Sequence, residues 1–263
     1  MAAGMLRWGT LSFAKHGAAM VLPPVERVRI ILDTAWRYQP QLLVTAGYAV
    51  DSIRELADLS RQLAILCPQV ALVTEVHHES DTEPDEPSRH AMWMVMAKGG
   101  KLHRFGEQAF GKAEETRRRE GDAIAKLRLQ LSHRTVRYRH WDVFGLICGE
   151  INIIHGREVT RFACPAIEQA ILAADIVINP THDRMSNAGT LIAKRKLLSR
   201  RAADGRDRLY ISCSNWDVSG EDRTRQNPSP TLHTAFRSGV PLDYLELADG
   251  RDGFVYRRWE YAI

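Results

Sequence analysis

The residue of this sequence with the clearest capacity for covalent chemistry is Cys148. It ends the apolar run Val143–Cys148 and is followed by Gly149 and Glu150. An apolar run without polar alternation is typical of a strand buried on both faces. Such a strand carries Cys148 to its C-terminal end, where open α/β folds place their reactive groups. A thiolate there could attack a carbonyl or nitrile carbon, whereas the alternative is a cysteine that fills the core.

Polar residues follow Cys148 closely along the chain. Glu150 could form a polar wall of a pocket, or it could cap the next helix or turn. Asn152 and His155 come next. His155 could exchange a proton with Cys148, and the alternative is a loop histidine that is hydrogen-bonded to the backbone.

The segment around Cys148 resembles the nucleophile strand of the nitrilase superfamily, the carbon–nitrogen hydrolases. Ile147–Glu150 (ICGE) is similar to that strand's end. Ala174–Thr181 (ADIVINPT) is similar to a later strand and turn of the family, and Ile211–Trp216 (ISCSNW) to its late strand ending in Asn. The three motifs share the family's order and spacing.

The resemblance implies a fold and a way of working. We expect an α/β protein with mixed sheets, arranged as a four-layer α-β-β-α sandwich, in one domain over residues 1–263. It implies thiol-dependent hydrolysis of a small-molecule amide or nitrile without a cofactor. It also implies a homodimer or larger homo-oligomer that packs through outer helical faces.

The family's catalytic triad also contains a glutamate base and a lysine that stabilises the oxyanion, and both positions are replaced here. The glutamate position falls on Gly47 and the lysine position on Glu107. An ionised carboxylate at the lysine position disfavours the thiolate and cannot stabilise an oxyanion. Under a shifted alignment Lys98, Lys101 or Lys112 supplies the amine. Glu75 could replace the missing carboxylate, or it could be an acid at a strand edge.

Two functions of different classes follow. The first is an amidase or nitrilase that acts through Cys148. The second is a catalytically degenerate protein that keeps the fold and pocket and binds a ligand or a protein partner. For either function we expect Glu150, Asn152, Thr181 and His182 to line the substrate site. The last two belong to or follow the Asn179-Pro180 turn, which the resemblance places near the mouth of the pocket. The alternative for His182 and Asp183 is a solvated loop.

A metal site is not expected. His77 and His78 are adjacent, and adjacent residues of an extended strand point to opposite faces. Neither pairs with a third ligand at a recognised spacing. The four cysteines form no C-x-x-C pair, which favours reduced thiols in a cytoplasmic protein.

Charge and hydropathy give weaker indications. The formal net charge of the 263 residues is +4. The basic tracts Arg117–Arg119 and Lys194–Arg201 are typical of solvated helix faces, so nucleic-acid binding is the minor alternative. The apolar N-terminus is short and contains Arg7, so we predict neither a signal peptide nor a membrane span.

Strands and helices are expected to alternate along the chain. A hairpin around Gly99-Gly100 joins two of the strands. We predict strands at 6–13, 41–46, 70–76, 91–96, 102–105, 135–138, 143–148, 176–179 and 209–214. We predict helices at 24–37, 51–66, 112–131, 166–172 and 191–203.

Overall fold

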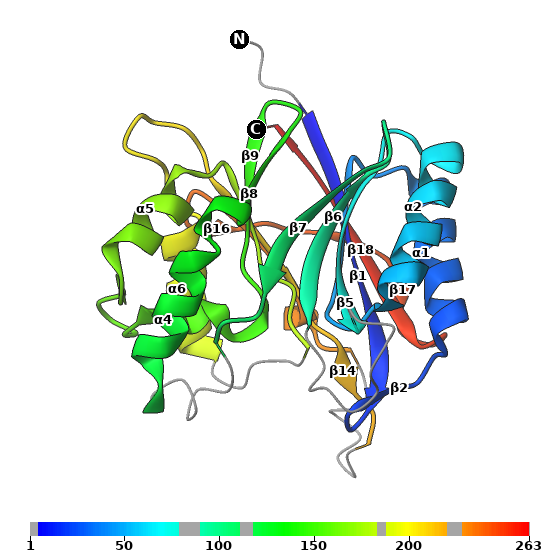
Figure 1. The fold of residues 1–263 in the computed structure, drawn as a ribbon, viewed down its shortest axis with the longest axis horizontal. Coiled ribbons are helices and arrows are strands. Elements are labelled where there is room, and N and C mark those ends of the chain that lie inside the picture. The colour runs from blue at the N-terminus through cyan, green and yellow to red at the C-terminus, as the bar shows by residue number, and fades with distance from the viewer. Residues whose placement is uncertain (1–4, 79–89, 111–117, 183–187, 220–227, 263) are drawn as a thin grey trace.

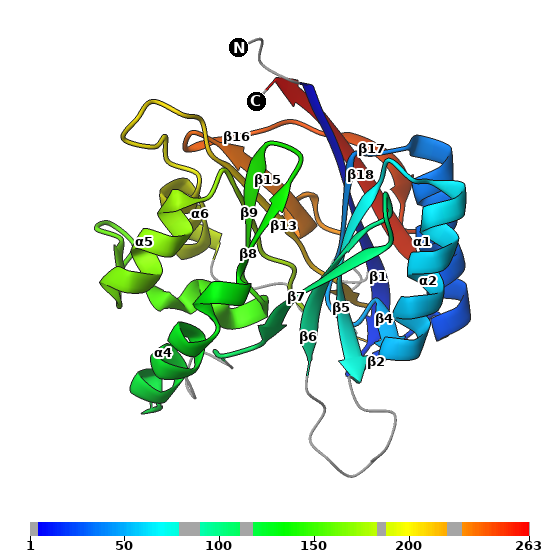
Figure 2. The same ribbon diagram turned by 45° about the horizontal axis from the view of Figure 1, so that its top comes forward.

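The computed structural model describes residues 5–78, 90–110, 118–182, 188–219 and 228–262. Two sheets lie face to face, and helices cover the outer face of each (Figures 1 and 2). The predicted α-β-β-α sandwich with mixed sheets is therefore confirmed. No helix in the described ranges is long and apolar enough to cross a membrane.

The first sheet is mixed, with β1, β3 and β5 parallel and its other main strands antiparallel to their neighbours. Three short strands pair with the C-terminal ends of β1 and β5. Its main order is β17 (Leu245–Asp249), β18 (Phe254–Ala262), β1 (Met5–His16), β3 (Leu42–Thr45), β5 (Ala71–His78), β6 (Ala91–Met96) and β7 (Lys101–Glu107); the short strands are β2 (Ala19–Met20), β4 (Val50–Ser52) and β14 (Trp216–Asp217).

The second sheet has a parallel centre, β9-β12-β13, between antiparallel edges. A separate short pair, β10 (Ile154–His155) and β11 (Arg161–Phe162), lies outside it. The strand order is β16 (Val240–Pro241), β15 (His233–Arg237), β13 (Leu209–Cys213), β12 (Ile176–Ile178), β9 (Trp141–Gly145) and β8 (Thr135–Tyr138).

The helices form the two outer layers. One layer consists of α1 (Pro24–Tyr38) and α2 (Ile53–Leu66), and the other of α4 (Glu120–Leu129), α5 (Pro165–Ala173) and α6 (Ala188–Leu198). The 3-10 turns are η1 (Leu131–His133), η2 (Cys148–Ile153) and η3 (Pro230–Leu232). Helix α2 begins two residues later than predicted, because the Ser52 hydroxyl caps it by accepting from the Glu55 N–H. Residues 111–117 of the predicted helix at 112–131 lie outside the described residues.

Alternation along each central strand explains why both faces are apolar. In β1, Leu6 and Trp8 pack between the sheets, whereas Leu11 and Phe13 pack toward the helices. In β12, Val177 likewise faces the helices while its neighbours face the other sheet. A strand with a layer on each side is apolar at most positions of both faces, so these strands could be predicted from continuous apolar runs.

Candidate functional site

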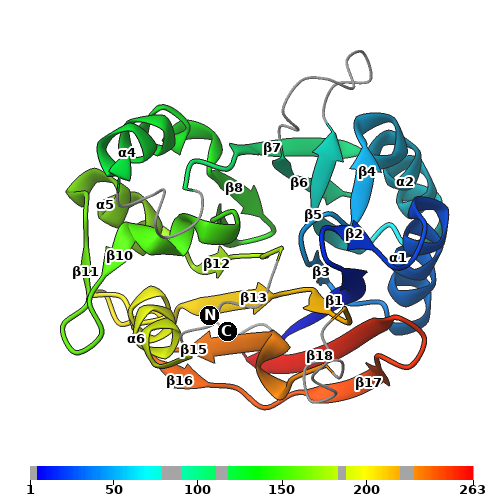
Figure 3. The same cartoon turned by 90° about the horizontal axis from the view of Figure 1, so that it is seen from below.

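The loops that follow β3, β9 and β12 meet at one edge of the sandwich, which Figure 3 views from below. Backbone hydrogen bonds join them there. The Gly47 N–H donates to the Thr181 carbonyl at 3.2 Å, and the Cys148 N–H donates to the Pro180 carbonyl at 2.9 Å. The carboxyl ends of parallel strands gather at one sheet edge, and this fold brings such an edge from each sheet together.

Cys148 lies beyond its strand rather than at the strand's end, which corrects the sequence prediction. Strand β9 ends at Gly145, and Cys148 begins the 3-10 turn η2 with φ +43°. This left-handed conformation is uncommon for a residue other than glycine. The Cys148 carbonyl accepts from the Asn179 side-chain amide at 3.1 Å. Because both backbone groups are bonded, the surroundings hold the half-buried thiol in this unusual conformation.

His182 and Glu75 form a buried ion pair beside Cys148. The His182 Nε2 lies 2.5 Å from the Glu75 Oε1, and the two side chains are 12% and 0% exposed. The ring of Tyr48 stacks on the His182 ring with centroids 3.9 Å apart. The side chain of Cys148 also forms a hydrogen bond with His182.

The charge of His182 follows from these neighbours. Burial disfavours the imidazolium, but the Glu75 carboxylate and the hydrogen bonds with Cys148 and Glu75 more than offset it. Together they raise the pKa of His182 to about 10. The ring is therefore a cation at neutral pH.

Gly47 provides the space that His182 occupies. A Cβ at Gly47 would lie 2.1 Å from the His182 Cδ2 and 2.9 Å from the Glu75 Oε2. The backbone is fixed there, because the Gly47 carbonyl accepts from the Asn215 side-chain amide at 2.6 Å. A side chain at this position is incompatible with the observed place of His182.

The buried carboxylate of Glu75 has one oxygen available to a ligand. Its Oε2 has no hydrogen-bond partner among the residues that the structure describes. A buried acceptor without a partner carries a cost of desolvation, so it is suited to accept from an N–H or O–H of a bound molecule.

Glu150 lies within the turn η2, behind Cys148, rather than in the wall of an open pocket. Its fully buried carboxylate accepts from the backbone N–H groups of Ile147 at 2.8 Å and Ala109 at 2.7 Å. Both oxygens also accept from the Arg134 guanidinium, each at 2.9 Å. The geometry therefore supports the alternative that Glu150 caps the turn.

Glu107, which the resemblance predicts at the lysine position, is bound to cations. Its carboxylate lies 3.1 Å from the Arg104 Nη2 and 3.6 Å from the Lys126 Nζ. These partners offset the negative charge that was expected to act on Cys148. Lys98 and Lys101 are exposed at the β6–β7 hairpin turn, and Lys112 lies outside the described residues.

Two other residues predicted to line the substrate site, and His155, considered as a proton partner of Cys148, have partners within the fold. The Asn152 Oδ1 accepts from the Lys194 Nζ at 3.0 Å. Thr181 is 2% exposed, and its hydroxyl lies 2.5 Å from the Ser214 hydroxyl. His155 pairs with Glu120 at 2.5 Å, away from Cys148. Asp183 lies outside the described residues.

Sequence reasoning missed the partnership of His182 with Glu75 and the roles of Tyr48, Arg134 and Asn215. Asn215 stands in a motif that carried the family resemblance, so it had a signal. Tyr48 and Arg134 had none, because their importance comes from contacts made across the fold.

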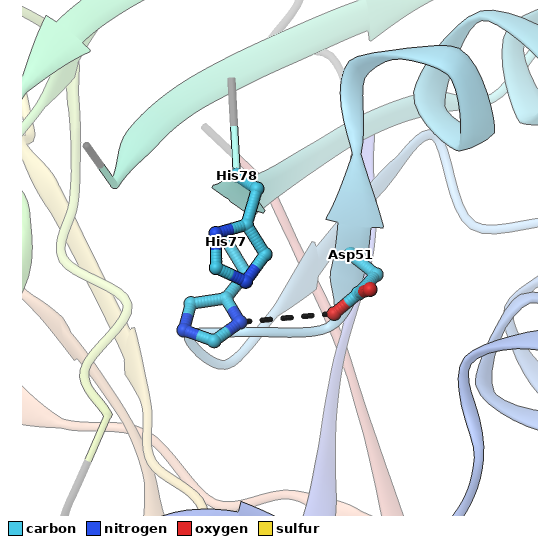
Figure 4. A group of neighbouring side chains, drawn as sticks. All are labelled: Asp51, His77 and His78. Carbon is cyan, nitrogen blue, oxygen red and sulfur yellow. Dashed lines mark ion pairs between the residues drawn. The ribbon is translucent and has the colours of Figure 1, made fainter. Parts of the chain in front are cut away.

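The argument against a paired histidine site is wrong at the end of β5. The rings of His77 and His78 lie with centroids 4.1 Å apart, although the residues are adjacent. The His77 Nδ1 is 3.7 Å from the Asp51 Oδ1 (Figure 4). Strict alternation holds within a strand, whereas His78 is its last residue and turns toward its neighbour.

Two open grooves lie away from Cys148. One, of about 820 Å³, separates α1 from the β17–β18 hairpin, and the other lies between α6 and the segment around Arg157. The candidate site therefore rests on the chemistry of its side chains rather than on the size of a groove.

No protein-family model and no curated protein matches the sequence. Solved structures do match. A glutamine-dependent NAD(+) synthetase from Cytophaga hutchinsonii matches with a TM-score of 0.55 at 9% identity, over 98% of this chain and 43% of that one. A carbon-nitrogen hydrolase from Helicobacter pylori G27 gives 0.51 at 11% identity, over 97% of this chain and 89% of that one. The C. elegans NitFhit protein gives 0.57 at 10% identity, over 98% of this chain and 61% of that one.

These likenesses show that the chain has the fold that these solved structures share, and one of them is a carbon-nitrogen hydrolase. The chain spans less than two thirds of the length of the NAD(+) synthetase and of NitFhit. At this level of identity the likeness concerns the fold alone. Any reaction of this chain depends on the side chains at the sandwich edge.

Proposed function

We propose that this protein is a thiol-dependent carbon–nitrogen hydrolase that acts on an amide or a nitrile through Cys148, His182 and Glu75. The observation that carries the proposal is the position of His182 in the space left by Gly47, between Cys148 and a buried carboxylate. The thiol, the cation and the carboxylate that the fold family combines in one site are then all present, but the cation and the carboxylate come from other positions.

The hydrolysis of an amide proceeds in two steps. The Cys148 thiolate adds to the carbonyl carbon, and the His182 imidazolium gives its proton to the leaving nitrogen as the C–N bond breaks. Ammonia or an amine leaves, and a thioester remains on Cys148. Neutral His182 then takes a proton from water, whose oxygen attacks the thioester and releases the acid and the Cys148 thiolate.

The roles of the other two residues follow from charge and space. Glu75 holds His182 in one orientation and stabilises its charged form before the first proton transfer and after the second. Its free Oε2 accepts a hydrogen bond from the substrate's N–H. For a nitrile the first adduct is a thioimidate, and its hydrolysis by two waters gives the same acid and ammonia.

The test combines thiol reactivity with turnover. Cys148 is labelled with iodoacetamide at pH 7 and located by mass spectrometry, in the wild type and in the His182→Gln variant. We expect labelling of Cys148 to slow about 10-fold or more in the variant, because the neighbouring cation is lost. Ammonia release from a panel of primary amides and nitriles should fall by about 10²- to 10⁴-fold in the variant, as for loss of a general acid–base, and vanish in Cys148→Ser.

His155→Gln is the matched control, because it removes a histidine close in sequence to Cys148 that pairs with Glu120 instead. It should label and turn over like the wild type. Equal labelling of Cys148 in the wild type and His182→Gln, together with no turnover of the panel, would favour the alternative of a degenerate protein that binds a ligand or a protein partner.

A further inference from the structure

A cluster of metal-ligating side chains lies where β4 and β5 end, outside the proposed triad. The donor atoms of Asp51, His77 and His78 all lie within 4.8 Å of one another. Figure 4 shows the carboxylate of Asp51 and the two rings gathered in one place. Neither the fold family's triad nor the proposed hydrolysis uses these three residues.

The register of the two strands explains the arrangement. β4 pairs in parallel with β5, with Val50 opposite Val76 and Ser52 opposite His78. Asp51 therefore lies beside His77 across the pair. His78 comes from the terminal position of the strand, where its exposed side chain is free to turn toward the same point. The grouping is thus built by strand pairing, which holds the backbone positions of all three residues.

The donor set selects a class of ion. Two imidazole nitrogens and one carboxylate oxygen suit Zn²⁺ and its neighbours among the transition metals, whereas Ca²⁺ and Mg²⁺ prefer oxygen ligands alone. A tetrahedral ion about 2.1 Å from each ligand places the donors about 3.4 Å apart. The Asp51–His77 separation of 3.7 Å is already close to that value. A small rotation of the exposed His78 ring completes the site.

We propose that Asp51, His77 and His78 bind a divalent transition metal ion, with Zn²⁺ as the best match, at the rim of the Cys148 site. Three protein ligands leave a coordination position open to water or to a ligand group. The partly exposed positions of Asp51 and His77 give the ion a path from solvent.

Tyr48 connects this metal site to the triad. Its ring lies 4.7 Å from the His77 ring and stacks on the His182 ring at 3.9 Å. An ion that fixes His77 also restricts Tyr48, and Tyr48 packs against the base of the proposed reaction. A bound ion would therefore restrict the position of the His182 ring through the packing of Tyr48. The ion has no role in the bond-breaking step.

Binding of Zn²⁺ alone to the metal-stripped full chain tests the proposal, by isothermal titration calorimetry. We expect one ion per chain with a Kd below about 10 μM. Loss of a ligand in His78→Ala should weaken binding by about 10-fold or more, as should the near-isosteric Asp51→Asn. His16→Ala is the matched control, since it removes an exposed histidine from the end of β1 and should bind like the wild type.

Cysteine thiols also bind Zn²⁺, so a second measurement separates the two sites. Co²⁺ at the proposed site has only nitrogen and oxygen ligands and should lack the intense charge-transfer absorption of a cobalt–thiolate bond. Cys148→Ser should keep the Zn²⁺ affinity. The proposal is overturned if the wild type binds no ion in this range, if His78→Ala and Asp51→Asn bind normally, or if Cys148→Ser abolishes binding. None of these results depends on whether the hydrolase activity exists.

Discussion

At the scale of single residues, Gly47, where the resemblance predicts a glutamate, provides space and lacks a carboxylate. The ring of His182 fills the position that a side chain at residue 47 would take. Glu75 then supplies the carboxylate from β5, the strand beside β3 in the sheet. Two replacements that suggest degeneration in the sequence are thus compatible with a working set of charges in the fold.

Gly47→Ala tests this relation directly. The backbone of Gly47 is outside the left-handed region, so alanine is tolerated there without backbone strain. Its methyl group would lie 2.1 Å from the His182 Cδ2, and the ring must move. We expect turnover and Cys148 labelling to fall by about 10- to 100-fold, since misplacement by about 1 Å has such costs.

The control for this variant is Gly121→Ala in α4, where a Cβ meets nothing within 4 Å. It should leave both rates unchanged. Wild-type rates in Gly47→Ala, with folding verified by circular dichroism, would contradict the placement of His182 beside residue 47.

The sequence identified some of these residues and not their grouping. Cys148 was recognisable because an apolar run precedes it, and Glu75 was recognised as a possible substitute carboxylate. His182 was assigned only to the substrate site, because its partner Glu75 is 107 residues away and no local pattern joins them. The same holds for His77 and His78, where a rule for strand interiors was applied to a strand end.

At the scale of elements, a buried ion pair supports the turn that carries Cys148. Arg134 follows η1, and Glu150 lies in η2; both side chains are 0% exposed. Arg134 also donates to the Glu107 carbonyl at 2.7 Å, which ties the end of β7 to the same point. Three segments far apart in the sequence therefore depend on one guanidinium.

Arg134→Met leaves the Glu150 carboxylate buried without its counter-ion. We expect the free energy of unfolding to fall by about 3–5 kcal/mol, the usual cost of breaking a buried pair. The double variant Arg134→Met/Glu150→Gln should lose less than the single one, because no uncompensated charge remains. Urea unfolding of both variants measures this, and a loss below about 1 kcal/mol for Arg134→Met would show that the pair is not structural.

The C-terminal strands could not be predicted from the hydrophobic pattern of the sequence. The interior strands were predicted because they are apolar on both faces. β18 contains Arg257, Arg258 and Glu260, and this charge hides the strand in the sequence. In the fold Arg257 is 2% exposed and pairs with Glu246 at 2.8 Å, so a buried cation replaces the expected apolar residue.

At the scale of the whole molecule, a buried histidine joins the two sheets. His233 of β15 lies 2.7 Å from the Thr10 hydroxyl and 2.6 Å from the Ser12 hydroxyl, both in β1. Burial, with a smaller effect of Arg257, holds the pKa of His233 well below its ordinary value of 6.5. The ring is neutral in the folded protein and accepts a proton readily only after unfolding.

The free energy of unfolding should therefore decrease as the pH is lowered into the acid range. An unfolded chain binds a proton at His233 below about pH 6.5, whereas the folded chain does not, so each pH unit below that value costs about 1.4 kcal/mol for this group. His90, whose pKa is lowered to about 4 chiefly by burial, adds to the loss between pH 6.5 and 4. His182, with a raised pKa, contributes stability that is complete below pH 6.5 and is lost as the pH rises toward 10.

Urea unfolding at pH 7 and pH 5 measures this slope. His233→Gln keeps hydrogen-bonding capacity toward the two hydroxyls but cannot titrate. We expect the variant to be less stable at pH 7 and to lose less stability than the wild type on acidification. An equal loss in both proteins would assign the acid sensitivity to other groups.

The pairing of β1 with β18 sets Met5 opposite Ala262. Met5 begins β1, and β1 runs parallel to β3, whose far end leads to Gly47. Both outer strand ends therefore lie at the edge of the sandwich opposite to the loop that follows β3. Figure 1 shows β1 and β18 running side by side to that edge. A short linker could join them into a circularly permuted chain, and a tag or a solid support attached at either end would leave the Cys148 edge facing solution.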